Sequence, residues 1–202
     1  LYVSAAFYGY MLVQTKGVWS APLDDVFIHF DYARSFARGY PFEWSEGNGY
    51  SSGNTSLTYP MVLGLGYWLG FRGLSLMIWA AIIACAGVFT FLYQAGRLVD
   101  GIPLPGGDAA PRGRWMKYLV PPAVLSMGAL DWTLFSGMEN AWHLGMWGLY
   151  IAAALNQWRA VDRQTVRRRT WLTGLTGVFV VAARPESAVC IAAIGTFGVG
   201  LA

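Results

Sequence analysis

The run from Leu74 to Gly96 contains no charged residue, and it constrains the fold more than any other part of the chain. A helix that crosses the hydrocarbon core of a bilayer needs about 20 apolar residues, and this run is long enough. The composition agrees, because 55% of the residues are hydrophobic and only 12% are charged, whereas soluble domains carry roughly 25% charged residues. The sequence therefore predicts an integral membrane protein of the all-α class.

Further apolar segments predict a polytopic transmembrane helix bundle rather than a single anchor. We expect spanning helices at about 1–14, 74–97, 118–135, 141–158, 171–184 and 187–202. The chain begins with Leu1 and is still apolar at Ala202. We therefore expect it to be the N-terminal part of a larger transmembrane module, truncated at both ends.

The charges of the connections predict which segments cross the membrane. Loops rich in Lys and Arg stay on the cytoplasmic side, which assigns the basic connections 97–117 and 156–170 to that side. The connection 14–56 should face outward, because acids are its main charges: Asp24, Asp25, Asp31, Glu43 and Glu46. Every connection lies on the side that its charge predicts only if the short, glycine-containing segment 57–70 does not cross the membrane. We expect 57–70 to be a juxtamembrane helix.

A second juxtamembrane helix is expected at about 24–38, where aromatic and small residues recur at helical spacing. It begins with Asp24 and Asp25, the only adjacent acid pair in the chain. Two neighbouring carboxylates repel each other, which raises one pKa unless a cation, a metal or a hydroxyl-bearing substrate shares the charge. The pair is a candidate catalytic site. The simpler interpretation is that acids favour the first turn of any helix.

Two short connections should emerge on the same outer face as the acid pair. One is 136–140, which contains Glu139, and the other is the tripeptide Arg184-Pro185-Glu186. Asp131 should lie about one turn below this face, and ionisable residues near the ends of spanning helices are functional candidates. The alternative is structural: Arg184 pairs with Glu186, Glu139 or Asp131 and only holds helices together.

These motifs together resemble a known family. The run Asp24-Asp25-Val-Phe-Ile-His-Phe-Asp-Tyr-Ala-Arg34, the loop Ser51 to Pro60, the run Ser136-Gly-Met-Glu139 and Arg184-Pro-Glu186 follow one another in the family's order. They are similar to the C-type superfamily of membrane glycosyltransferases, which use polyprenyl-phosphate sugar donors and include protein mannosyltransferase-like and arabinofuranosyltransferase-like enzymes. The resemblance covers essentially the whole chain.

The resemblance implies an inverting transfer of a hexose or pentose from a polyprenyl-phosphate donor to an extracytoplasmic acceptor, which is a glycan, a lipid or a protein. Such chemistry requires a carboxylate to accept the acceptor's proton and a cation to receive the lipid phosphate. On this resemblance Asp24 or Asp25 is the base, and Glu139 binds the acceptor or orients the base. Arg184 would clamp the phosphate with two hydrogen bonds, and Glu186 would orient Arg184.

Other residues are weaker candidates for substrate contacts. His29 follows Asp25 by one helical turn and is a metal partner, a proton shuttle or simply a surface partner of that acid. Ser52 and Thr55 belong to a turn-rich loop that shapes the acceptor groove or simply connects two helices. We assign no metal ligands and no certain cofactor. The acid pair alone is a weak metal site, which leaves a divalent ion open.

Two other classes of protein suit the same hydrophobicity and loop charges. One is a transporter or flippase subunit whose acids relay a proton or cation, and the other is a non-catalytic scaffold. The acids lie near the outer surface rather than at mid-membrane, which favours the enzyme. We expect a multi-pass protein of the cell membrane with an extracytoplasmic active site. The bilayer is its partner, and nucleic acid is not.

Overall fold

The computed structural model describes residues 2–100, 116–160 and 162–200. Within these ranges all regular elements are helical, which confirms the all-α class. In chain order they are α1 (Tyr2–Gln14), α2 (Asp25–Ala37), α3 (Tyr59–Trp68), the 3-10 helix η1 (Gly73–Ser75), α4 (Leu76–Asp100), α5 (Met116–Leu125), α6 (Gly128–Phe135), α7 (Asn140–Trp158), α8 (Arg163–Ala183) and α9 (Ser187–Gly200).

One helical stretch among the described residues, Gly73–Val99, is long and apolar enough to cross a membrane. Ser187–Thr196 is apolar but shorter. This finding is consistent with membrane association. The remaining spans expected from the sequence are not established by it.

The segment 118–135, expected as one spanning helix, is instead two helices. α5 ends at Leu125 and α6 begins at Gly128, with Met127 in an extended conformation between them. Pro121 and Pro122 lie inside α5, where each lacks the N–H that a helix interior requires, and glycine at 128 also disfavours a continuous helix. The expectation of an unbroken helix was wrong because average hydropathy does not register these backbone effects.

Helices also form near both segments expected to be juxtamembrane. α2 occupies 25–37 of the expected 24–38, and α3 occupies 59–68 of the expected 57–70. α2 buries one face, which includes Val26, Phe30 and Ala33. α3 begins with Pro60 in its first turn, where the missing N–H costs no hydrogen bond.

The close packing of α4 against α7 depends on glycines. A Cβ atom added to Gly87 would lie 2.2 Å from the backbone oxygen of Ala141, and one added to Gly145 would lie 2.8 Å from Gly87 Cα. Gly148 similarly approaches the backbone of Phe91. Small residues allow two helix backbones to come this close.

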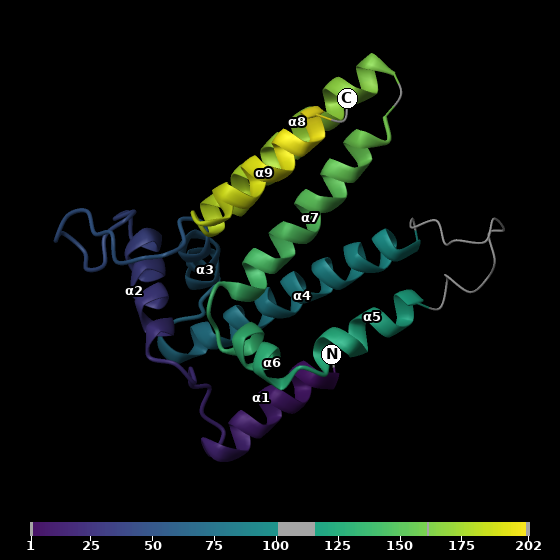
Figure 1. Ribbon diagram of the computed structural model, residues 1–202. Coiled ribbons are helices and arrows are strands. Elements are labelled where there is room, and N and C mark those ends of the chain that lie inside the picture. Colours follow the sequence, from purple (N-terminus) through teal and green to yellow (C-terminus); the bar gives the residue numbers. More distant parts are fainter. Residues whose placement is uncertain (1, 101–115, 161, 201–202) are drawn as a thin grey trace.

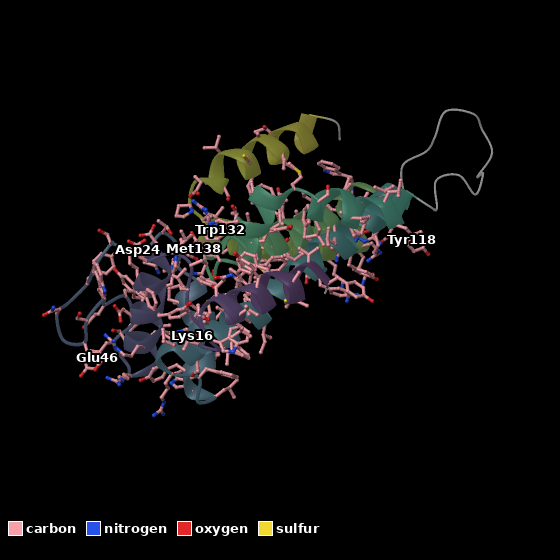
Figure 2. All side chains as sticks on the ribbon, turned by 90° about the horizontal axis from the view of Figure 1, so that it is seen from below. Lys16, Asp24, Glu46, Tyr118, Trp132 and Met138 are labelled. Atoms are coloured by element: carbon pink, nitrogen blue, oxygen red, sulfur yellow. The ribbon has the colours of Figure 1, made fainter. Side chains whose placement is uncertain are left out.

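The helices are arranged so that several connections meet at one end (Figure 1). α2 and α3 lie there, together with the start of α7 and the turn between α8 and α9 (Figure 1). Figure 2 places Asp24, Glu46 and Met138 toward this end and Tyr118, in α5, at the opposite end. The fold therefore brings three connections to one end of the molecule: the one that contains Asp24, the one that contains Glu139 and the one that contains Arg184.

Candidate functional site

A buried pair of ionisable side chains lies at this end. His29 of α2 and Glu139, the N-cap residue of α7, are only 3% and 1% exposed, and His29 Nε2 lies 2.9 Å from Glu139 Oε2. The distance suits an ion pair, but Glu139 Oε2 and His29 Nδ1 have no hydrogen-bond partner of good geometry among the described residues. The contact joins α2 to the start of α7 through two buried ionisable groups. His29 contacts Glu139 and does not act as a surface partner of Asp25.

The second oxygen of Glu139 links the pair to two other elements. Thr55 Oγ1 donates a hydrogen bond of 3.0 Å to Glu139 Oε1, and Arg184 Nη1 lies 3.7 Å from the same oxygen. Burial by itself raises the pKa of Glu139, but the contact with His29 and the hydrogen bond from Thr55 outweigh it and lower the pKa from 4.5 to about 2. Glu139 is thus a stable carboxylate in spite of its burial.

Arg184 connects the buried carboxylate to the surface. It lies between α8 and α9, is 31% exposed, and its Nη1 donates a 2.8 Å hydrogen bond to Asn140 Oδ1. Its Nε donates a 2.5 Å hydrogen bond to Glu186, which is itself 61% exposed. Within the described part of the chain, Nη2 of Arg184 has no acceptor. The Nη2 donors of the guanidinium therefore remain for a further acceptor.

Backbone contacts hold these elements together. The Tyr59 hydroxyl donates a 2.7 Å hydrogen bond to the carbonyl of Gly137, and Leu57 N–H donates one of 2.9 Å to the carbonyl of Ala182. Gly137 has φ +95, a conformation that favours glycine. A Cβ there would also lie 3.1 Å from Val26 in α2. The start of α3 is thus fixed to both the α6–α7 connection and the end of α8.

The structure leaves Asp24 and Asp25 outside this cluster. Both are exposed at the start of α2, and Asp24 Oδ1 accepts a 3.0 Å hydrogen bond from the backbone N–H of Asp25. Across the described residues, no hydrogen bond or ion pair joins either acid to Glu139 or Arg184. The acids share α2 with His29, and Asp25 precedes it by one helical turn.

Two cavities adjoin the cluster. The first, which we call the loop cavity, has a volume of about 360 Å³ and is lined by Tyr32, Phe36, Phe42, Tyr50, Ser51, Ser52, Asn54, Thr55, Ser56, Leu57, Pro60, Met61 and Pro185. The second, the helix cavity, has a volume of about 620 Å³ and is lined by Leu57, Tyr150, Thr173, Gly174, Gly177, Val178, Val181, Ala182, Pro185, Ile191 and Gly195. Leu57 and Pro185 line both, so a partly polar cavity and an apolar one adjoin these two residues.

The sequence-predicted residues therefore divide into three groups. Glu139, Arg184, Glu186, His29 and Thr55 form one connected cluster. Ser52 lines the loop cavity, and Asp24 and Asp25 are apart from both. Sequence reasoning missed Asn140, although its position directly after Glu139 was a usable signal. Among the described residues, no group of three or more His, Cys, Asp and Glu side chains forms a metal site.

Comparisons with known proteins identify no relative of this chain. No protein-family model matches it, and neither the curated proteins nor the solved structures include a significant match.

Proposed function

We propose that this protein transfers a sugar from a polyprenyl-phosphate donor to an extracytoplasmic acceptor. The observation that carries the proposal is that a partly polar cavity and an apolar cavity share Leu57 and Pro185, and that Pro185 directly follows Arg184 in the chain. A lipid-linked sugar has the matching order of groups: an apolar chain, an anionic phosphate and a polar sugar. The helix cavity suits the chain because almost all of its lining is apolar.

Arg184 is the residue that we assign to the phosphate. Its Nη2 has no acceptor in the described part of the chain, and its other donors are held by Asn140 and Glu186. Holding the guanidinium in advance reduces the entropy lost when an anion binds. Glu139 is too buried to meet an acceptor, so we assign it a positioning role that it exerts through Arg184 and Thr55.

In the proposed reaction, the acceptor hydroxyl loses its proton to Asp24 or Asp25 while its oxygen bonds to the anomeric carbon of the sugar. The bond between that carbon and the phosphate oxygen breaks with its electron pair, and the polyprenyl phosphate leaves beside Arg184. Both acids are exposed at the start of α2, where an acceptor hydroxyl can approach them. Among the described residues neither acid contacts Arg184 or lines the loop cavity, so the acceptor has to reach from the donor phosphate to the start of α2 for the transfer to occur. A general base contributes typically about 10² to 10⁴-fold to the rate.

The proposal includes a multi-pass arrangement in which the end that carries Glu46 and Met138 (Figure 2) faces outward. Cysteines placed at 46 and 138 should react with an impermeant thiol reagent added from outside, whereas a cysteine at 164 should not. External labelling at 164 would place the basic connection outside and contradict the arrangement.

The activity is tested by incubating membranes that contain the full-length protein with radiolabelled polyprenyl-phosphate sugars. Label should move into an acceptor other than the donor lipid, and Asp24→Asn or Asp25→Asn should nearly abolish this. Asp31→Asn is the matched control, because Asp31 lies on the same helix but pairs with Arg34. Movement of the labelled lipid across the bilayer without any transfer would instead establish the transporter class.

A further inference from the structure

The loop cavity contains two aromatic side chains that the proposed transfer chemistry does not use. Tyr50 is 80% exposed and Phe42 is 41% exposed, although both line the cavity. Large exposed aromatic groups beside hydroxyl groups are characteristic of sites where one face is apolar and the other is polar. Their presence raises the question of what occupies the cavity.

The cavity carries no charge. None of the described residues that line it is Asp, Glu, Lys, Arg or His, so it offers no partner for a phosphate, a carboxylate or an ammonium group. Burial of an unpaired charge there would be unfavourable. The occupant is therefore a neutral molecule, and the lipid phosphate belongs at Arg184.

The cavity also offers hydrogen-bonding groups that a hydrocarbon chain would leave without partners. Ser51, Ser52, Asn54 and Thr55 contribute hydroxyl and amide groups to its lining. Within the described residues, the hydroxyls of Ser52 and Tyr50 have no hydrogen-bond partner of their own. A ligand with several hydroxyl groups would satisfy them, and its C–H face would cover an aromatic ring.

Hydrogen bonds hold the backbone at the mouth of the cavity in place before any ligand binds. Ser51 N–H donates a 3.0 Å hydrogen bond to the Phe42 carbonyl, and the Tyr32 hydroxyl donates one of 2.8 Å to Ser51 Oγ. Phe42 has φ +65, a left-handed conformation that is unfavourable for a residue with a side chain. Such a conformation persists only where surrounding contacts fix it. The two sides of the cavity mouth are thus tied to each other and to α2.

We propose that the loop cavity is a binding subsite for neutral sugar rings, with Tyr50 and Phe42 as the stacking surface and Ser52 as a hydroxyl partner. The acceptor of the transfer would then be a neutral glycan rather than a lipid or a protein. This last statement rests on the proposed function, whereas sugar binding itself does not. Thr55 joins the subsite to Glu139, since it lines the cavity and donates to that carboxylate.

The test measures binding without any donor present. Neutral mannotriose and arabinotriose are each titrated against the full-length protein in nanodiscs, and saturation-transfer NMR reports contact with the protein. At least one should bind, and a trisaccharide of the same size that contains glucuronic acid should bind more weakly. Tyr50→Ala and Phe42→Ala should each weaken binding by about five- to tenfold, as expected for the loss of one aromatic contact.

Two further variants make the result specific. Tyr40→Ala is the matched control, because Tyr40 is an exposed tyrosine of the same connection, at 42%, and does not line the cavity. It should leave binding unchanged. Tyr50→Phe keeps the ring and should retain most of the affinity, which separates stacking from hydrogen bonding by the phenol.

The outcomes distinguish the subsite from the proposed function. Sugar binding that depends on Tyr50 supports the subsite even if no transfer is detected. A different outcome is transfer to a protein or lipid acceptor, with an acceptor KM that Tyr50→Ala leaves unchanged. This result would overturn the subsite but would still support the proposed transferase activity. If neither trisaccharide binds and Tyr50→Ala instead weakens retention in the bilayer, the aromatic residues are membrane anchors and the proposal is wrong.

Discussion

The α4–α7 interface and the cluster around Glu139 are neighbouring regions held together by opposite means. At the interface, Gly87, Gly145 and Gly148 let two backbones touch with almost no side chain between them. In the cluster, side chains from α2, the Ser51–Ser56 loop and the α8–α9 turn converge on one buried carboxylate. The first region depends on shape and the second on charge. They should therefore respond differently to substitution and to pH.

The largest effect is expected from breaking the buried pair. His29→Leu leaves Glu139 buried without its closest side-chain partner, and removal of one member of a buried pair costs about 3–5 kcal/mol of unfolding free energy. The double variant His29→Leu/Glu139→Gln should cost clearly less than the sum of the two single changes. Denaturant unfolding in detergent measures all three, and additivity within about 0.5 kcal/mol would show that the two side chains are not coupled.

Acid should weaken the cluster and not the glycine interface. The folded-state pKa of Glu139 is about 2, below its ordinary value of 4.5, so its carboxylate stabilises the fold fully above pH 4.5 and loses that contribution as the pH falls toward 2. The linked free energy is about 3 kcal/mol. The difference in stability between the parent and Glu139→Gln should shrink over this window.

The same amide substitution at Glu43 provides the comparison for the acid effect. Glu43 Oε2 accepts a hydrogen bond from the backbone N–H of Gly47 in the connection between α2 and α3. Glu43→Gln therefore removes one carboxylate without touching the pair of His29 and Glu139. A pH-dependent change as large for Glu43→Gln as for Glu139→Gln would mean that acid acts on the connection between α2 and α3 rather than on the buried pair.

A methyl group is enough to test the glycine interface. The added Cβ of Gly87→Ala would lie 2.2 Å from the Ala141 backbone oxygen, so the helices must separate. Overpacking of this kind costs about 1–3 kcal/mol, independent of pH. Gly174→Ala in α8 is the control because nothing lies within 4 Å of its added methyl, and alanine there should raise helix stability by up to about 1 kcal/mol. Equal thermal stability of the two variants would show that the interface can separate without cost.

The sequence predicted features that depend on local pattern. The amphipathic spacing and the loop charges identified the helices that the structure has at 25–37 and 59–68. The break between α5 and α6 was missed because hydropathy averages over a segment, although Pro121, Pro122 and Gly128 were visible signals. The pairing of His29 with Glu139 was not predictable from spacing. The residues are far apart in the chain, and His29 has a nearer acid in Asp25 one turn away on the same helix.

The smallest change in the free energy of unfolding is expected from loss of the contact between Arg184 and Glu186, although its distance is the shorter of the two that Arg184 makes with glutamates. Arg184 Nε lies 2.5 Å from Glu186, whereas Arg184 Nη1 lies 3.7 Å from Glu139. Distance alone would rank Glu186 first, but its side chain is 61% exposed and that of Glu139 only 1%. Water screens an exposed pair, which contributes about 0–1 kcal/mol. Glu186→Gln should therefore change the free energy of unfolding by less than about 1 kcal/mol, and Glu139→Gln by several times more. A loss at Glu186 as large as at Glu139 would mean that the turn between α8 and α9 is covered in the membrane and that the charge cluster extends through it.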